Sequence, residues 1–426
     1  MPWRYRIKLS GKFLLLVILT QLLGPGNLPP GDELARIRAF TTGEEFDYIS
    51  WTLKALGAKL EQASLPVSNY LDESTQKLAV LDYLTLVREI QNTERQLNDI
   101  YADPNIEDVE VQAAPVRAHL EELFRQRSRR GPLAESILQN QLALIVTDMD
   151  FTLGGQPIPP VLYRSSPLPW ALIVSPREVI RQDANISLKT ELTVEDNIAL
   201  EREIDEALNV SSLVVPVGGI GSYPTMIAQT TNLVWLVDVV AHEWIHNYLT
   251  LRPLGFSYNS SSEVRTMNET VASIAGKEIG LALIARFYPE FLPPAPPPAQ
   301  SQSDESQPPP TPEPPSFDFR AEMNITRLTA DQLLAEGKID EAEAYMESRR
   351  QVFWEHGYRI RKLNQAYFAF HGAYADVPGG AAGEDPVGAA VRALWAQSPS
   401  LVSFVNRISW LTSFEQLQIL LAGTPE

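Results

Sequence analysis

The sequence predicts an α+β fold that is predominantly helical, and three observations lead to this expectation. Long stretches on both sides of the middle of the chain carry apolar residues at helical spacing. Short apolar runs bounded by Pro and Gly, which are typical of strands, occur mainly between residues 160 and 230. The chain has 426 residues, of which 44% are hydrophobic, and this is enough for a sizeable core.

Residues 1–30 have the pattern of an export signal. Basic residues precede the largely apolar stretch 13–23, namely Arg4, Arg6, Lys8 and Lys12. A membrane-spanning helix needs about 20 residues, so this stretch is short for one. No small-residue cleavage site follows it, so a signal peptide, a short membrane anchor and a buried N-terminal helix all stay open. The first two predict an extracytoplasmic protein, secreted or anchored to the membrane by its N-terminal segment.

Residues 31–142 are expected to form a helical accessory region. Their apolar residues recur at helical spacing, for example at Leu78, Leu81, Leu84 and Val87. The pattern predicts helices at 46–63, 75–103, 116–125 and from 133 onwards. Because no catalytic pattern occurs in this region, we expect it to pack against the rest of the chain.

The motif that follows suggests a different chemistry. An apolar run from residue 142 leads to Asp148, Asp150 and Thr152, and this resembles the first motif of haloacid-dehalogenase-type phosphatases. The resemblance implies a strand that ends in a nucleophilic Asp148 with magnesium beside it. That family also needs a later acidic pair, which the downstream sequence lacks, and loop-like residues follow the motif. A phosphatase therefore stays an alternative.

Residues 160–230 alternate short apolar runs with turns. The runs predict strands at 167–177, 211–217 and 225–230, with a charged helix at 194–208. These strands are expected to form a small sheet whose last strand comes just before the next helix.

The strongest motif is His-Glu-x-x-His, formed by His242, Glu243 and His246 inside the apolar run 233–249. The run contains no Gly or Pro, and Asn232 can cap its start, so it predicts a helix. Residues i and i+4 lie on one face of a helix, so both imidazoles can bind one zinc ion, and Glu243 can take a proton from water. Alternatively, these are hydrogen-bonded core residues. Burying them without partners would cost on the order of several kcal/mol, which favours the metal site.

Catalytic zinc usually has three protein ligands, and Glu269 is the candidate for the third. It belongs to the sequence Asn-Glu-Thr-Val-Ala at 268–272, which opens a second apolar, helical stretch. The alternative is an acidic residue in the first turn of a helix, where the helix dipole favours it.

Together the two motifs resemble those of the gluzincin metallopeptidases, the thermolysin-like and aminopeptidase-like enzymes. The resemblance implies zinc (Zn2+) as cofactor, with His242, His246 and Glu269 as metal ligands and Glu243 as the general base. It also implies a zincin-like catalytic core at 143–292, in which a small sheet lies next to the His-Glu-x-x-His helix. In that family the edge strand of the sheet pairs with the bound peptide.

The resemblance covers about residues 210–290, and it has departures. Thermolysin-like enzymes carry an Asp four residues after the third ligand, which orients a metal-bound imidazole, whereas this chain has Ser273 there. Asp238, one helical turn before His242, can take that role or can be a polar residue near a helix start. The Gly-x-Met-x-Asn stretch of one aminopeptidase branch does not occur upstream of His242. The choice between endopeptidase and exopeptidase therefore stays open.

Residues 293–316 contain 11 prolines and predict a disordered Pro-rich loop. Residues 317–426 return to helical spacing and are expected to form the C-terminal helical part of the catalytic domain. The expected helices lie at 329–336, 339–350 and 354–370, with two more in 384–420.

The gluzincin resemblance further implies a His or Tyr, from a downstream segment, that stabilises the oxyanion of the reaction. Tyr367, His371 and Tyr374 are the candidates. His371 is followed by Gly, as at a helix end, and we expect it to be the second catalytic residue beside Glu243. Each candidate can instead be a buried polar aromatic residue bonded to backbone.

Composition limits the function further. The formal net charge of −18 argues against a nucleic-acid partner, because an acidic surface repels phosphate. The absence of cysteine excludes thiol nucleophiles and cysteine zinc sites. We therefore expect a zinc metallopeptidase that hydrolyses peptide or protein substrates. The alternative is a non-catalytic, membrane-associated interaction protein with a structural or vestigial zinc site. The sequence does not indicate an oligomeric state.

Overall fold

The computed structural model describes residues 33–64, 67–102, 108–292, 317–372 and 385–423. The signal or anchor expected at 1–30 and the Pro-rich loop expected at 293–316 lie outside the described residues. The chain divides into two compact units, Met1–Gly43 and Glu44–Glu426. In the first unit the structure describes the helix α2 (Glu33–Thr41).

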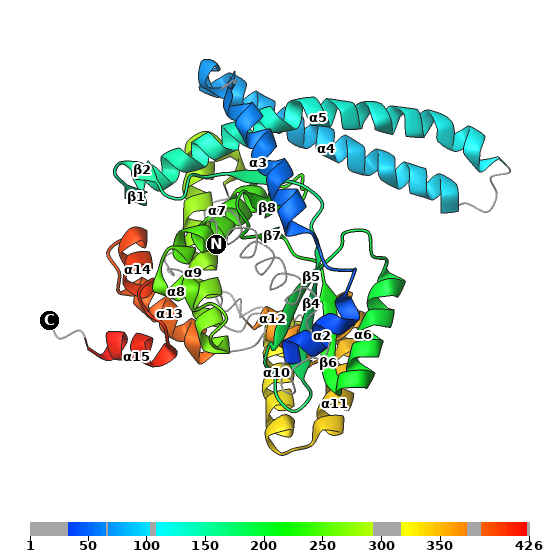
Figure 1. Cartoon of the computed structure of the whole chain (residues 1–426), viewed down its shortest axis with the longest axis vertical. Coiled ribbons are helices and arrows are strands. Elements are labelled where there is room, and N and C mark those ends of the chain that lie inside the picture. Colours follow the sequence, from blue (N-terminus) through cyan, green and yellow to red (C-terminus); the bar gives the residue numbers. More distant parts are fainter. Residues whose placement is uncertain (1–32, 65–66, 103–107, 293–316, 373–384, 424–426) are drawn as a thin grey trace, which may run out of the picture. The chain divides into compact units, whose positions relative to one another are not determined.

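The second unit contains most of the helices and all of the described strands, and the structure confirms the predominantly helical α+β class (Figure 1). Its N-terminal helices are α3 (Tyr48–Ser64), a short 3-10 helix (Val67–Tyr70), α4 (Glu73–Ala102) and α5 (Val109–Asp148). Its central helices are α6 (Val194–Leu208), α7 (Leu233–Thr250), α8 (Pro253–Phe256), α9 (Ser262–Phe287) and a 3-10 helix (Pro289–Phe291). Its C-terminal helices are α10 (Phe319–Ala335), α11 (Ile339–Glu355), α12 (Gln365–His371), α13 (Pro386–Ala396), α14 (Leu401–Ile408) and α15 (Phe414–Ala422).

The described strands form three small sheets. The first is a hairpin of β1 (Thr152–Leu153) and β2 (Gln156–Pro157). The second has the order β3-β8-β7, in which β8 (Thr225–Ile227) pairs parallel with β3 (Tyr163–Ser165) and antiparallel with β7 (Gly219–Ile220). The third is antiparallel with the order β5-β4-β6, built from β4 (Trp170–Pro176), β5 (Ala184–Leu188) and β6 (Val210–Val215).

Several of these elements match the sequence expectations. The strands expected at 167–177, 211–217 and 225–230 correspond to β4, β6 and β8, and the helix expected at 194–208 is α6. A capping box formed by Thr193 and Asp196 fixes the start of α6. The expected single sheet is wrong, because β8 belongs to a different sheet from β4 and β6.

Helix α5 joins two helices that the sequence suggested as separate. It runs without a break through Pro115 and Pro132. A proline inside a helix costs about 3 kcal/mol or more, and burial of apolar residues such as Ile137 and Leu142 in the main core offsets this cost. The boundary expected between residues 142 and 143 therefore falls inside α5.

The helical state of residues 142–148 also bears on the phosphatase alternative. That alternative needs a strand leading to Asp148, but Asp148 is the last residue of α5. Its carboxylate forms an ion pair with Arg286, at 2.6 Å. The described structure therefore lacks the strand on which the phosphatase motif depends.

The C-terminal helices differ from expectation in two places. The helix expected at 354–370 is wrong, because α11 ends at Glu355 and α12 begins only at Gln365. Gly357 has φ +89°, a conformation that favours glycine and ends the helix. Three helices, rather than two, follow residue 384.

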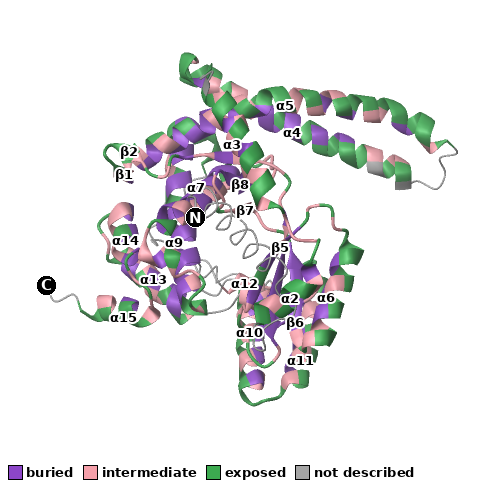
Figure 2. Ribbon diagram, viewed as in Figure 1, coloured by how far each residue is buried: buried purple, intermediate pink, exposed green. Residues whose placement is uncertain are grey.

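The main hydrophobic core joins α4, α5, α7 and α9 to the C-terminal helices α13, α14 and α15. Buried residues line α7 and α9 along most of their length (Figure 2). The two helices that carry the predicted metal ligands therefore lie in the best-packed part of the unit. None of the helices in the described part of the chain is both long and apolar enough to cross a membrane.

Candidate metal centre

Helix α7 carries both histidines of the His-Glu-x-x-His motif. Asn232 caps its start, as expected, by accepting a hydrogen bond from the backbone N–H of Trp235 at 3.1 Å. Because α7 is continuous from Leu233 to Thr250, His242 and His246 lie one turn apart on the same face. Their ring centroids are 4.8 Å apart.

Helix α9 carries Glu269 well beyond its first turn, since the helix begins at Ser262 and is capped by Ser261. The alternative that the helix dipole alone places an acid there does not apply at this position. Two glycines bring α9 close to α7. A Cβ atom on Gly276 would lie 3.0 Å from the backbone nitrogen of His242, and one on Gly280 would lie 3.1 Å from Cα of Asp238.

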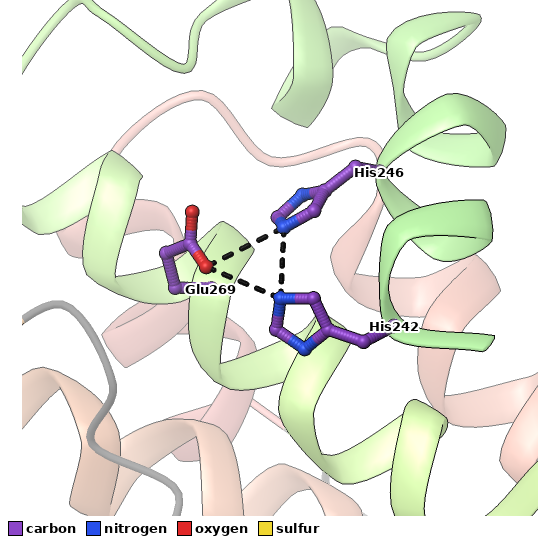
Figure 3. A group of neighbouring side chains, drawn as sticks. All are labelled: His242, His246 and Glu269. Atoms are coloured by element: carbon purple, nitrogen blue, oxygen red, sulfur yellow. Dashed lines mark hydrogen bonds and ion pairs between the residues drawn. The ribbon is translucent and has the colours of Figure 1, made fainter. Parts of the chain in front are cut away.

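The structure brings His242, His246 and Glu269 together (Figure 3). The Nε2 atoms of the two histidines are 3.1 Å apart, and each lies 3.4 Å from Oε2 of Glu269. A tetrahedral zinc ion with ligand bonds of about 2.0–2.1 Å separates its ligand atoms by roughly 3.3 Å. The three atoms are therefore spaced as the ligands of one such ion would be.

The two oxygens of Glu269 have different surroundings. The hydroxyl of Tyr258 donates to Oε1 at 2.5 Å, whereas Oε2 is buried and has no hydrogen-bond partner among the described residues. A buried carboxylate oxygen that accepts no hydrogen bond is costly, and a cation between it and the two imidazoles would lower that cost. Two histidine nitrogens and one carboxylate oxygen also form a donor set that catalytic zinc commonly has. The residues present therefore fit a zinc ion.

Asn268 orients one of the histidines. Its Oδ1 accepts a hydrogen bond from Nδ1 of His246 at 2.7 Å, which leaves Nε2 of that ring to face Glu269. A partner on the second ring nitrogen fixes the tautomer and the orientation of a metal-binding histidine. Asn268 is 2% exposed, so this contact is shielded from water.

The charges of the group are strongly coupled. Burial alone would lower the pKa of His246, but the carboxylate of Glu269 outweighs burial and raises the pKa to about 9. Burial alone would raise the pKa of Glu269, but the charge of His246 and the ion-pair contacts of Oε2 with both histidines hold it well below its usual value. The negative charge of Glu269 thus stabilises a proton on His246, as it would stabilise a bound cation.

Glu243 lies next to the metal ligands in an enclosed position. Its side chain is buried, and burial raises its pKa. Residues of the β7 segment cover it closely, since a Cβ atom on Gly219 would lie 2.7 Å from Oε1 of Glu243. A Cβ atom on Gly221 would lie 3.4 Å from Oε2 of Glu243 and 3.1 Å from Cβ of His246. Only residues without a side chain fit over the carboxylate in this arrangement.

The edge strand beside the site differs from the expected one. The strand directly before the metal helix, β8, lies between β3 and β7 and so has no free edge. The edge strands of this sheet are β3 and β7, and β7 contains Gly219. The expectation that the last strand before the helix offers a free edge is therefore wrong.

Two cavities adjoin Glu243. The larger has a volume of about 520 Å³ and includes His246 and Glu269 in its lining. The smaller has a volume of about 300 Å³ and includes His242 and Lys277. Glu243 contributes to the walls of both, so a ligand in either cavity can reach its carboxylate.

The expected oxyanion donors lie in different places. His371 ends α12 and lines the smaller cavity with Glu243, and burial lowers its pKa to about 4. Tyr367 packs against His371, with ring centroids 4.3 Å apart, and lies among apolar residues rather than in the lining of either cavity. Tyr374 lies outside the described residues.

Ser273 and Asp238 both line the smaller cavity with His242. The role of Asp238 in orienting His242 stays a prediction.

Sequence patterns did not identify three contributors to the site. These are Asn268, Tyr258 and the glycines at and just after β7, Gly219 and Gly221. Asn268 is adjacent to Glu269 in the motif, and its position on the same helix is the signal that could have identified it. Tyr258 lies in the turn region between α8 and α9, where no periodicity predicts the direction of a side chain. The glycines at 218–221 suggested a turn or, weakly, a phosphate-binding loop, and neither interpretation places them over Glu243.

No protein-family model, curated protein or solved structure matches this chain.

Proposed function

We propose that this protein is a zinc-dependent peptidase that hydrolyses peptide bonds, with Glu243 as general base. The observation that supports the proposal is the convergence of two imidazole nitrogens and one buried carboxylate oxygen at 3.1–3.4 Å from one another. A second carboxylate, Glu243, lies beside them and opens onto a cavity of about 520 Å³. This combination is suited to activating a water molecule.

In this proposal His242, His246 and Glu269 hold the ion, and Tyr258 and Asn268 keep two of these ligands in place. Zinc, when bound, would act as a Lewis acid and lower the pKa of water to about 7. Glu243 accepts the proton of the attacking water and then passes it to the nitrogen of the leaving amine. The backbone over Glu243, at Gly219 and Gly221, shields this proton transfer from bulk water.

The lining of the larger cavity supports a peptide as the ligand. It contains many amide and hydroxyl side chains, including Gln182, Asn185, Ser187, Ser222 and Asn259. Such groups can pair with the N–H and C=O groups of an extended backbone. The proposed export of the chain, by a signal or an anchor at 1–30, would place this activity outside the cytoplasm.

The first experiment is metal analysis of protein purified without residues 1–30, next to Glu269→Ala and Glu243→Gln variants. We expect one equivalent of zinc in the parent protein and in Glu243→Gln, and a large loss of zinc in Glu269→Ala. A peptide-library screen should then show hydrolysis by the parent and none by Glu243→Gln. Full activity of Glu243→Gln would refute the assignment of the base.

A structural zinc site in a non-catalytic interaction protein is the competing function. The two functions predict different effects of a chelator on hydrolysis. Removal of zinc from a peptidase abolishes hydrolysis, which returns when zinc is added back. If the site is structural, removal of zinc would only lower the melting temperature of the protein. No hydrolysis would then be detected with or without zinc.

A further inference from the structure

The wall of the larger cavity opposite the metal helices comes from distant parts of the chain. Tyr48, the first residue of α3, lines this cavity together with Ser187 and Asn185 of β5. Glu243, His246 and Glu269 line the same cavity. A ligand that fills it therefore contacts the metal group and this wall together.

Backbone pairing fixes the position of Tyr48. The N–H of Phe46 donates to the carbonyl oxygen of Ser187 at 2.9 Å, and Glu45 forms a bridge with Leu188. The segment before α3 thus lies along β5, to which it is joined by an isolated antiparallel bridge. The ring of Phe46 also packs edge-to-face against Tyr48, with centroids 5.0 Å apart. These contacts hold the start of α3 beside the cavity.

The hydroxyl of Tyr48 lies 2.7 Å from Oγ of Ser187, and either group can be the donor. If the serine hydroxyl donates to the phenol oxygen, the phenol proton is free for a ligand. Burial raises the pKa of Tyr48, and the negative charge of Glu243 adds to this effect, so the phenol keeps its proton at neutral pH. Tyr48 is therefore a hydrogen-bond donor at the edge of the site.

The other candidate donors near the site cannot offer a proton to a ligand in the larger cavity. Tyr258 already donates its proton to Oε1 of Glu269. Tyr367 is surrounded by apolar residues and is not part of the cavity lining. His371 lines the smaller cavity, which does not include His246 or Glu269. Among these groups, Tyr48 is the one that lines the same cavity as Glu243, His246 and Glu269 and has a phenol proton available. That proton can go to a ligand when Ser187 donates to the phenol oxygen.

We propose that Tyr48 is a catalytic residue whose hydroxyl, oriented by Ser187, donates a hydrogen bond to the carbonyl oxygen of the peptide bond being cleaved. The proposal rests on the peptidase function proposed above. It assigns the N-terminal helix α3 a direct part in the reaction, where the sequence suggested only packing. The hydrogen bond strengthens as the carbonyl oxygen gains negative charge, so it stabilises the transition state more than the bound substrate.

The test compares zinc-loaded, purified parent protein with Tyr48→Phe and Ser187→Ala. Tyr48→Phe should keep one equivalent of zinc and change KM little, while kcat falls about 100-fold, as for the loss of one oxyanion donor. Ser187→Ala should lower kcat less, because the phenol proton remains. Tyr223→Phe is the matched control and should keep parental kcat, since its hydroxyl donates to the carbonyl oxygen of Pro160. A rise in KM alone, or an unchanged kcat, for Tyr48→Phe overturns the proposal.

Inhibitor binding supplies a readout that is independent of turnover. A phosphinic peptide mimics the tetrahedral intermediate, whereas a small hydroxamate binds mainly through the metal. Tyr48→Phe should lose affinity for the phosphinic peptide by about the same factor as kcat and keep its affinity for the hydroxamate. Equal affinity of parent and variant for the phosphinic peptide overturns the role of Tyr48 and leaves the proposed peptidase function standing. If the zinc-loaded parent neither cleaves peptides nor binds the phosphinic peptide, the peptidase function fails, and the role of Tyr48 fails with it.

Discussion

At the scale of single residues, Asn268 provides a test of the metal centre that leaves the ligands themselves intact. Asn268→Ala removes the acceptor at Nδ1 of His246. We expect the affinity for zinc to fall about 10–100-fold, as is usual when the partner of a metal-binding histidine is lost. Competition with a chromogenic chelator measures this change. Asn140→Ala on α5, which removes hydrogen bonds to Ser68 and Asn69, is the control and should keep the parental affinity. Parental affinity in Asn268→Ala would contradict the role assigned to this contact.

The sequence identified the residues whose relation is set by one helix or by a known pair of motifs. His242, Glu243 and His246 lie within one and a half turns of α7, so helical geometry alone relates them. Glu269 required the additional resemblance to a family. Tyr258 and Tyr48 reach the site through tertiary packing of α8, α9, α3 and β5, and no local pattern encodes such contacts. His371 lies in a cavity beside Glu243, and its role in catalysis stays a prediction.

At the scale of elements, the metal centre depends on the close approach of α7 and α9. Gly276→Ala places a methyl group 3.0 Å from the backbone nitrogen of His242 and 3.1 Å from the carbonyl oxygen of Asp238. Backbone atoms cannot move aside as a flexible side chain can, so the helices must separate. We expect a loss of about 1–3 kcal/mol in the free energy of unfolding. The affinity for zinc should fall as well, because Glu269 moves away from the histidines.

Thermal unfolding and zinc competition measure both effects. Gly57→Ala on α3 is the matched control, because no heavy atom lies within 4 Å of the added Cβ. That variant should gain up to about 1 kcal/mol from helix propensity and keep its zinc affinity. If Gly276→Ala behaved like Gly57→Ala, the two helices would not be in the close contact described.

The strand β7 gives a second prediction at this scale. A methyl group in Gly219→Ala would lie 2.7 Å from Oε1 and 2.8 Å from Cγ of Glu243. The Glu243 side chain can swing away and Cγ1 of Val239, 2.9 Å from the added Cβ, can turn aside, so the variant should fold and keep its zinc, but the general base is displaced. We expect kcat to fall about 100-fold, within the usual contribution of a general base. Gly218→Ala, whose added Cβ instead meets Cζ2 of Trp235 at 2.9 Å, should lose much less activity. Equal losses in the two variants would show that the effect comes from strand distortion.

Elements with strong local signals were predictable, and those defined by packing were not. Helix α6 has a capping box and a clear periodicity, and its predicted bounds agree with the structure. Helix α5 continues through Pro132 because tertiary burial overrides the local break. Strand β7 has two residues and no alternation to detect. A zincin-like arrangement of these elements stays a prediction.

At the scale of the whole molecule, the main core joins residues that are far apart in the sequence, from Val80 on α4 to Leu417 on α15. The C-terminal helices contribute buried residues to the same core as the metal helices, including Val391, Leu394, Phe404, Val405 and Ile408. Two polar contacts reinforce this packing. The hydroxyl of Tyr248 on α7 donates to Oδ1 of Asn406, and the N–H of Leu254 donates to the carbonyl oxygen of Ser409. The candidate metal centre thus depends on a core to which the C-terminal helices α13, α14 and α15 contribute.

This long-range organisation predicts opposite outcomes for two deletions. Removal of residues 373–426 strips α13, α14 and α15 from α9, and each large apolar side chain that loses its cover forfeits about 1.5–3 kcal/mol. Since a domain is stable by only about 5–15 kcal/mol, this variant should not fold or bind zinc. Replacement of residues 96–118 by a short Gly-Ser linker instead removes the distal ends of α4 and α5. It leaves in place Leu86, Ile90, Leu120 and Leu123, which form a cluster separate from the main core. That variant should unfold cooperatively and bind one equivalent of zinc with the parental affinity.

Thermal unfolding and metal analysis measure the folding and the zinc binding of both variants. Loss of zinc on shortening the α4–α5 pair would mean that its distal part supports the metal centre, and a folded, zinc-binding 1–372 fragment would mean that the C-terminal helices do not.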